Sequence, residues 1–228
     1  MQLNTTNKDA AKLGLTPCQL PFAIPSDLIS GIFQRDSKIS GLAAGRQRRK
    51  LEFSAGRYAA ENCLTELGIA SEVGRAKDRR PVWPEGAVGS ISHSDRFAWS
   101  AVGLAKDYAS IGIDTEPIAE RSTFNQLCEE IFNQGEEKFG DAMELDELQT
   151  FTTIFSAKES FYKCVYPMNP VFFGFHDVRV VCADSQTITM QLAKRSPNQF
   201  NSKKPIQIDY VVTGRDVFTA CWLRPTDI

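Results

Sequence analysis

The chain has 228 residues, which suits one large domain or two domains of about 110 residues each. Its 26 basic and 28 acidic side chains give a net charge of −2, and this balance argues against a dedicated nucleic-acid-binding protein, which usually carries a marked basic excess. A hydrophobic fraction of 42% is typical of a globular protein, and because there is no apolar run of about 20 residues and no signal peptide at the start, we expect a cytoplasmic protein without a membrane span.

The first half is predicted to contain one helix followed by two strands. Apolar positions on one face predict a helix over residues 51–67, ended by Gly68. The stretch 74–89 is rich in glycine, proline and charge and is predicted to be a loop. The apolar segments 97–104 and 109–113 are predicted to be neighbouring strands joined by a short turn.

The second half is predicted to contain helices followed by an antiparallel sheet. Residues 124–147 form an acidic stretch that is typical of a broken helix, and residues 148–166 form the clearest helix, halted by Pro167. Alternating apolar segments then predict four strands, at 178–182, 187–192, 206–212 and 217–223.

The order helix, strands, helix, strands favours an α+β fold made of two halves. We place the boundary so that residues 1–118 form the N-terminal half and residues 119–228 the C-terminal half.

Charge is unevenly distributed along the chain. Residues 46–80 carry nine basic and five acidic side chains, a net of +4, whereas residues 107–147 carry twelve acidic and two basic ones, a net of −10. One interpretation is a pair of solvated faces of opposite sign. The other is a basic region for an anionic ligand beside an acidic site for a cation.

Two carboxylates lie at the end of an apolar segment, at Asp114 and Glu116. Side chains two apart on a strand point to the same side, so these carboxylates repel each other unless a cation lies between them. Oxygen ligands of this kind favour Mg²⁺. Alone, an Asp-x-Glu pair at a strand end is a weak signal, since acidic residues there are common.

A second candidate group lies on the helix over 148–166. On a helical wheel Glu159 falls close to an apolar stripe that includes Leu148, Phe155 and Tyr162, with Lys163 one turn further. The alternative is an exposed Glu–Lys pair worth about 0.2–0.5 kcal/mol. A carboxylate at an apolar stripe needs a partner, and a metal shared with Asp114 and Glu116 would supply one.

His93, Ser92 and the arginines are candidates for binding an anion. His93 and Ser92 are suited to contact a phosphate or a ribose, although a structural histidine is an equal alternative. Arg49 and Arg57 lie eight residues apart, and their planar guanidinium groups donate paired hydrogen bonds to phosphate. Six scattered cysteines without a C-x-x-C pair, and only two histidines, argue against a disulfide framework and against a polyhistidine metal site.

Together these segments resemble the 4′-phosphopantetheinyl transferases, most closely those of the enterobactin synthase component D type. The resemblance runs from about Arg48 to Phe175 and depends on motifs that occur in one order. These are R-R-K-x-E-F-x-x-x-R at 48–57, P-x-W-P-x-G-x-x-G-S-I-S-H at 81–93, G-I-D-x-E at 112–116, F-S-A-K-E-x-x-x-K at 155–163 and F-G-F-x-D-V at 173–178.

The resemblance implies a pseudo-twofold pair of similar α+β halves, with coenzyme A bound in the cleft between them. It also implies a reaction in which the phosphopantetheine arm of coenzyme A passes to a serine hydroxyl of an acyl or peptidyl carrier protein, leaving adenosine 3′,5′-bisphosphate. The expected cofactor is Mg²⁺, the expected pathways are siderophore or other secondary-metabolite syntheses, and the expected state is a monomer.

The resemblance also implies roles for individual residues. Asp114, Glu116 and Glu159 are expected to bind Mg²⁺, and Glu159 is the expected general base, with Glu116 or a metal-bound water as alternatives. Lys163 is expected to protonate the departing phosphate, and Lys158 to contact the pyrophosphate. The remaining coenzyme A contacts are expected from Arg49, Arg57, Arg75, Ser92, His93 and the backbone at Thr115. Among these, Arg49, Arg57 and His93 are the expected contacts to the 3′-phosphate.

Two alternatives to this reading differ from it in the sequence. A nucleotide hydrolase would be expected to carry a phosphate loop of the G-x-x-x-x-G-K-S/T type, and none is present. A non-catalytic module binding coenzyme A or a carrier protein would tolerate loss of the three carboxylates, which are all present. The other ten acidic residues of 107–147 are expected on a solvated surface.

Overall fold

The computed structural model describes residues 6–36, 45–168, 170–192 and 204–228. The chain divides into two compact units, Met1–Asp107 and Tyr108–Ile228. Each unit combines helices with an antiparallel sheet, so the α+β class expected from the sequence is confirmed. Within the described ranges no helix has both the length and the apolar character that crossing a membrane requires.

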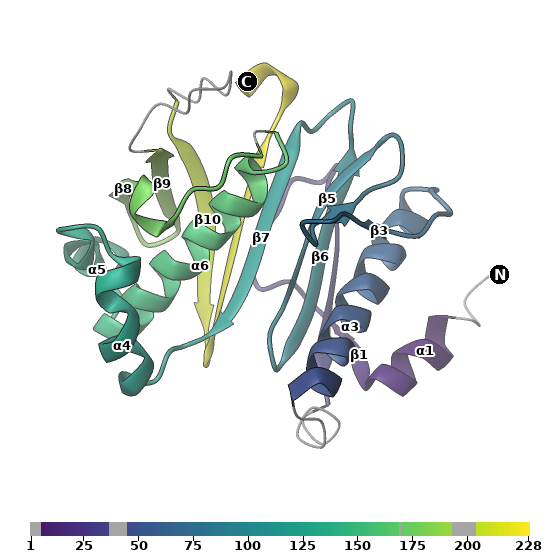
Figure 1. The fold of residues 1–228 in the computed structure, drawn as a ribbon, viewed down its shortest axis with the longest axis horizontal. Coiled ribbons are helices and arrows are strands. Elements are labelled where there is room, and N and C mark those ends of the chain that lie inside the picture. Colours follow the sequence, from purple (N-terminus) through teal and green to yellow (C-terminus); the bar gives the residue numbers. More distant parts are fainter. Residues whose placement is uncertain (1–5, 37–44, 169, 193–203) are drawn as a thin grey trace. The chain divides into compact units, whose positions relative to one another are not determined.

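The first unit is a four-stranded antiparallel sheet with a long helix packed on it. Helix α3 (Gly45–Glu66) lies on the sheet through small residues such as Ala55, Ala59 and Ala60, which are almost completely buried. Helix α1 (Thr6–Leu13) packs against α3 (Figure 1). The sheet has the order β1 (Leu15–Cys18), β2 (Ile29–Arg35), β6 (Phe97–Leu104), β5 (Ala87–His93), and a separate ribbon pairs β3 (Gly74–Arg75) with β4 (Pro81–Val82).

The second unit is a five-stranded antiparallel sheet with helix α6 (Glu147–Val165) packed on it. Shorter helical segments precede and follow α6: α4 (Arg121–Ile131), η1 (Glu136–Lys138), α5 (Phe139–Met143), η2 (Phe175–Asp177) and η3 (Pro225–Asp227). The strand order is β7 (Ser110–Pro117), β11 (Asp216–Leu223), β10 (Ile206–Thr213), β9 (Thr187–Leu192), β8 (Val178–Ala183).

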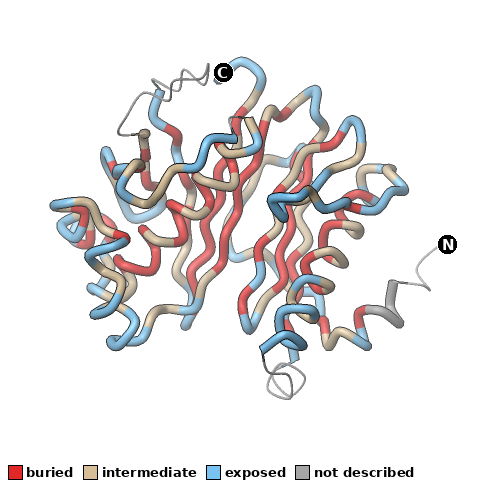
Figure 2. The backbone as a smooth tube through the Cα atoms, viewed as in Figure 1, coloured by how far each residue is buried: buried red, intermediate tan, exposed pale blue. Residues whose placement is uncertain are grey.

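Local sequence signals explain where α6 begins and which side is buried. Asp146 caps the N-terminus in a capping box with Gln149, which satisfies backbone donors that the first turn leaves free. Phe151, Ile154 and Phe161 are buried with the sheet residues, as Figure 2 shows for this helix and its strands. Because apolar side chains recur at helical spacing, one side of α6 becomes the core of the unit.

The stripe of Leu148, Phe155 and Tyr162 is not the most deeply buried side of α6, although the helical wheel suggested an apolar seam there. All three side chains are only half-buried. Phe155 packs on Phe175 with ring centroids 5.6 Å apart, so this stripe contacts the segment that follows the helix.

Three predictions about the elements need correction. Helix α3 begins at Gly45 rather than at residue 51. Residues 45–50 form its arginine-rich first turns, and because they are exposed they lack the apolar pattern on which the prediction depended. The predicted loop 74–89 contains β3, β4 and the start of β5. The two strands predicted as neighbours, β6 and β7, belong to different sheets, since β6 pairs with β2 and β5 whereas β7 pairs with β11.

The boundary between the units also differs from the predicted one at 118/119. Strand β7 is hydrogen-bonded along its length to β11, from Ser110 opposite Leu223 to Pro117 opposite Asp216. The strand therefore belongs to the C-terminal unit, which starts at Tyr108. As a consequence Asp114 and Glu116 lie in the same unit as Glu159 and are not part of the N-terminal half.

Candidate functional site

Asp114 is a buried carboxylate held between β7 and α6. Its side chain is almost inaccessible, and its two oxygens have different partners. Ser156 Oγ donates to Oδ2 at 2.8 Å, and Lys163 Nζ donates to Oδ1 at 2.7 Å and to the carbonyl of Ile113 at 3.1 Å. Asp114 is therefore oriented by two side chains of one helix.

The spacing of the helix residues explains this arrangement. Ser156 and Lys163 are seven residues apart, which is close to two full turns, so both side chains lie on the same face of α6. That face packs on β7 and β11. Thr219, which pairs with Asp114 across the strands, shares a hydrogen bond with Ser156 at 3.0 Å and with Ser160 at 2.6 Å.

Glu116 and Glu159 complete a group of carboxylates around Lys163. Burial raises the pKa of Glu116 to about 8; the negative charge of Asp114 adds to this, Lys163 opposes it, and Glu159 raises it slightly further. Burial also raises the pKa of Glu159, opposed by Lys163 and assisted by Asp114. Like charges close together in a poorly solvated place have this effect, so three carboxylates and one ammonium interact here.

The donor chemistry of this group fits a hard divalent cation, although the side chains do not form a closed ligand set. Three carboxylates that repel one another are the type of oxygen ligands that Mg²⁺ prefers. Among the described residues, however, no three His, Cys, Asp or Glu side chains are grouped so that they could hold a metal as they stand. The Lys163 ammonium rests on Asp114 and supplies the positive charge instead.

An aromatic pocket adjoins Glu159. It has a volume of about 680 Å³, and its walls come from α6 and from residues 172–178. Tyr162 and Phe173 pack with ring centroids 4.9 Å apart, and Phe172 is 80% exposed. The pocket therefore combines an apolar wall with charged residues, namely Lys158 and the carboxylates of Glu130, Glu159 and Asp177.

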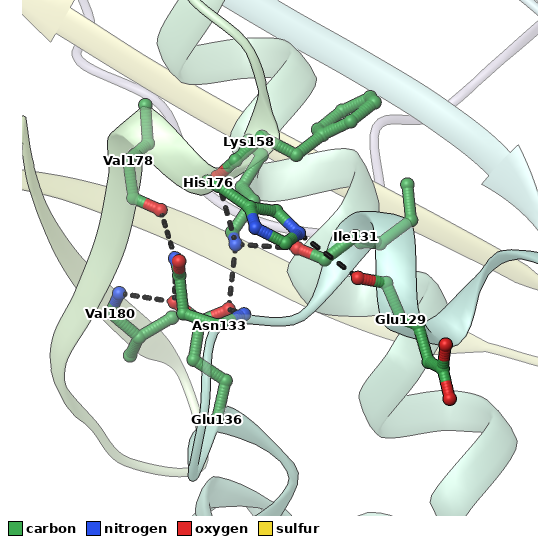
Figure 3. A network of polar contacts seen from close by, with 9 residues as sticks. Glu129, Ile131, Asn133, Glu136, Lys158, His176, Val178 and Val180 are labelled. Carbon is green, nitrogen blue, oxygen red and sulfur yellow. Dashed lines mark hydrogen bonds and ion pairs between the residues drawn. The ribbon is translucent and has the colours of Figure 1, made fainter.

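The ammonium of Lys158 is buried against Glu136 of η1. It donates to Glu136 Oε2 at 2.6 Å, to the carbonyl of Ile131 at 2.7 Å and to the carbonyl of Phe175 at 3.2 Å (Figure 3). The side chain is 1% exposed, and burial lowers its pKa while Glu136 opposes the shift. The three ammonium protons are thus directed at three oxygens of the protein.

In the first unit, the structure brings Arg57 and Arg75 to one aromatic ring. Their guanidinium carbons lie 4.9 Å and 5.3 Å from the ring centre of Phe53, which is 41% exposed. Arg57 also donates to the carbonyl of Val73 at 2.9 Å. Burial lowers the pKa of Arg57, Glu61 opposes the shift and Arg75 adds to it, so two positive charges are held close together.

The other predicted residues of the first unit lie on α3 and β5. Arg49 is exposed on the first turns of α3. On β5, Ser92 is buried and His93 is exposed. The His93 ring lies beside Gly56, where an added Cβ would be 3.7 Å from Cδ2, so His93 is close to the turn of α3 that carries Arg57.

Thr115 and the acidic residues of 107–147 differ in how far they are buried. Thr115 is fully buried and pairs with Phe218 of β11. Eight of the ten other acidic residues of 107–147 are exposed, Asp107 is half-buried, and Glu136 is 3% exposed. The expectation of a solvated surface is therefore wrong for Glu136, because the buried Lys158 ammonium lies against it.

Sequence reasoning did not identify several residues that shape this region. Ser156, Tyr162 and Phe173 lie within the sequence motifs, but the motifs alone assign them no role. Glu136 follows Gly135, which has a φ of 89° and begins the 3₁₀ turn η1. A glycine next to an acidic pair inside a helical stretch indicates a sharp turn, and this was the available signal that the stretch is more than a solvated helix.

Two protein-family models match the chain. The 4′-phosphopantetheinyl transferase N-terminal domain matches residues 40–103, and the 4′-phosphopantetheinyl transferase superfamily matches residues 110–215. The match to the first model lies in the first unit, and the match to the second model lies in the second.

Individual relatives agree with the family models. The chain is 35% identical over 150 residues to enterobactin synthase component D of Salmonella typhimurium, a match that covers 66% of this chain and 62% of that protein. It is 30% identical over 175 residues to 4′-phosphopantetheinyl transferase Svp of Streptomyces mobaraensis, covering 76% and 70%. It is 29% identical over 169 residues to 4′-phosphopantetheinyl transferase Npt of Nocardia iowensis, covering 70% and 74%.

Proposed function

Because the chain belongs to the 4′-phosphopantetheinyl transferase superfamily, we propose that it transfers the phosphopantetheine arm of coenzyme A to a serine hydroxyl of a carrier protein. The observation that supports this most directly is the gathering of Asp114, Glu116, Glu159 and Lys163 where α6 packs on β7. Carboxylates and one ammonium beside an apolar pocket suit a reaction at a phosphoryl group attached to a long, mostly uncharged arm.

We propose that Asp114, Glu116 and Glu159 hold Mg²⁺. When bound, the ion would supply positive charge to the pyrophosphate and stabilise negative charge on the leaving group. The ammonium of Lys163 contacts Oδ1 of Asp114, so a bound ion would compete with it for this carboxylate. Lys163 would then be available to the phosphate, within reach of the same carboxylates.

The reaction forms one P–O bond and breaks one. The serine oxygen bonds to the phosphorus that carries the pantetheine arm, and the bond from this phosphorus to the bridging oxygen breaks, releasing adenosine 3′,5′-bisphosphate. We propose that Glu159 accepts the serine proton, because its burial and its neighbour Asp114 raise its pKa and so make it a stronger base. We propose that Lys163 donates a proton or a hydrogen bond to the leaving phosphate.

The aromatic pocket of the second unit is suited to the pantetheine arm. It adjoins Glu159, and Phe173 and Tyr162 offer apolar surface to a chain of methylene and amide groups. In the first unit we propose that Arg57 and Arg75 contact the 3′-phosphate of coenzyme A, because two neighbouring guanidinium groups bind a dianion well. Arg49, Ser92 and His93 remain candidates for further contacts.

We propose an acyl or peptidyl carrier protein as the partner. Five relatives are named enterobactin synthase component D, so a carrier of siderophore or other secondary-metabolite synthesis is the preferred candidate. We propose a monomer, since one chain carries both family regions. The proposed location is the cytoplasm, where coenzyme A and carrier proteins are present.

The proposal is tested by incubating the purified chain with coenzyme A, Mg²⁺ and apo-carrier proteins and measuring the intact carrier masses. The expected result is a gain of one phosphopantetheine group, abolished by replacing the carrier's acceptor serine with alanine and by removing Mg²⁺ with a chelator. Failure to modify any of several acyl and peptidyl carriers would contradict the proposed function.

A further inference from the structure

We infer that the buried Lys158–Glu136 pair positions the wall of the aromatic pocket, and that these two are positioning residues for the transfer reaction; the inference rests on the proposed function. The pair joins α6 to the turn η1, and its polar contacts continue into the segment that carries the pocket wall (Figure 3). Residues 172–178, which form one side of the pocket, are called the pocket segment below.

Both carboxylate oxygens of Glu136 accept hydrogen bonds from other elements of the second unit. Oε2 accepts from Lys158 Nζ and from the backbone N–H of Asn133 at 2.9 Å, and Oε1 accepts from the backbone N–H of Val180 at 2.8 Å. A carboxylate with this many donors has its position fixed. Glu136 therefore links α6 to the start of strand β8, directly after the pocket segment.

Two further hydrogen bonds are accepted by backbone carbonyls of the pocket segment. Lys158 Nζ donates to the carbonyl of Phe175, and Asn133 Nδ2 donates to the carbonyl of Val178 at 2.6 Å. His176 Nε2 donates to the carbonyl of Glu129 at the end of α4, at 3.0 Å. The segment thus lies against a polar network on one side and the pocket on the other.

The geometry disfavours a direct contact between Lys158 and the pyrophosphate. An ammonium group has three protons, and the three oxygens around Lys158 account for all of them. The Lys158 and Glu136 side chains are 1% and 3% exposed.

The test compares three variants with the wild type. Glu136→Gln removes the charge of a residue that does not line the pocket. Lys158→Met combined with Glu136→Leu replaces the pair by apolar side chains, so that no unpaired charge stays buried. Glu147→Gln is the matched control, since Glu147 forms an exposed ion pair with Arg121 in the same unit.

Two measurements are made on each variant at a temperature where it is folded. Amide hydrogen exchange of the pocket segment reports its order, and steady-state kinetics report KM for coenzyme A and kcat. For Glu136→Gln and for the double variant we expect exchange in the pocket segment faster by about tenfold or more. We also expect a KM for coenzyme A higher by about tenfold with kcat changed less than about threefold, because the pocket wall binds the arm.

The outcomes separate three explanations. If Lys158 contacted the pyrophosphate directly, the double variant would raise KM while exchange stayed at the wild-type value, and Glu136→Gln would leave KM unchanged; this result overturns the inference. A purely structural pair would leave the KM of the folded protein unchanged, which also overturns it. The control Glu147→Gln is expected to match the wild type in both measurements.

The wild type in the same assay distinguishes this inference from the proposed function. If the wild type modifies no carrier protein, the proposed function fails, and hydrogen exchange still decides whether the pair orders the pocket segment. Wild-type exchange in the pocket segment of the double variant would overturn the inference even where the wild-type enzyme is active. If Glu136→Gln does not fold, the double variant supplies both measurements.

Discussion

Ser156 Oγ donates a hydrogen bond of 2.8 Å to Oδ2 of Asp114, and this contact orients a buried carboxylate from the neighbouring helix. The other oxygen of Asp114, Oδ1, accepts a hydrogen bond from the ammonium of Lys163. Asp114 thus presents one oxygen to a cation and keeps the other for the protein. The same division would suit a bound Mg²⁺, with Ser156 fixing the carboxylate that holds it.

Ser156→Ala is expected to weaken Mg²⁺ binding more than it weakens the fold. Loss of a hydrogen bond to a charged group costs about 1–3 kcal/mol of stability. A group that orients a metal ligand typically contributes about 10–100-fold to metal affinity. Titrating Mg²⁺ against transfer activity measures the apparent affinity, and urea unfolding measures the stability.

Ser110→Ala is the matched control for that experiment. Like Ser156, Ser110 donates a hydrogen bond between β7 and α6; it lies on β7, and its acceptor is the backbone carbonyl of Cys164 rather than a carboxylate. We expect a similar loss of stability and an unchanged Mg²⁺ requirement. Equal Mg²⁺ affinities for the two serine variants would mean that Ser156 does not orient a metal ligand.

Mg²⁺ is expected to raise the melting temperature of the protein without coenzyme A present. A ligand that binds only the folded state stabilises it by RT ln(1 + [L]/Kd), about 2.7 kcal/mol at a hundredfold excess over Kd. Asp114→Asn is expected to abolish both this stabilisation and transfer, because it removes one negative charge from the three carboxylates. Calorimetry with and without a chelator measures the shift; an equal shift in Asp114→Asn would remove Asp114 from the metal site.

Gly112→Ala is expected to destabilise the second unit by about 3 kcal/mol or more. A Cβ at this position would lie 1.9 Å from the carbonyl oxygen of Ser160 and 2.8 Å from Cβ of Cys164, so α6 would have to move away from β7. Denaturant unfolding measures the change. Gly174→Ala is the control, since a Cβ there meets nothing within 4 Å; similar costs for the two variants would contradict this account of the packing.

The sequence predicted the individual elements of the second unit well, because their patterns are local. Helix α6 has a capping box, apolar spacing and a following proline; β9 and β10 alternate buried and less buried residues, and β11 is a nearly continuous apolar run. The partner of β7 was not predictable in the same way. Its neighbour β11 lies about a hundred residues away in the chain, and pairing over such distances depends on the whole sheet.

The site was predicted in composition but not in contacts. Asp114, Glu116, Glu159 and Lys163 were identified from their motifs, and the structure brings them together. Adjacent residues on a helix point in different directions, and this is why Lys158 contacts Glu136 while Glu159 faces the carboxylate group. Motif spacing does not specify the partner of a buried lysine when that partner lies on another element.

Arg57→Gln and Arg75→Gln are each expected to weaken coenzyme A binding by about tenfold. Each variant removes one charge-assisted contact to phosphate, and such a contact contributes about 1.5–3 kcal/mol at most. The loss should be much smaller for a coenzyme A that lacks the 3′-phosphate, because the proposed contact is then absent in wild type and variant alike. Calorimetric titration with the two ligands measures this difference. Arg80→Gln is the control, because Arg80 pairs with Asp78 at the surface of the same unit. Equal losses for both ligands would show that Arg57 and Arg75 act elsewhere than on the 3′-phosphate.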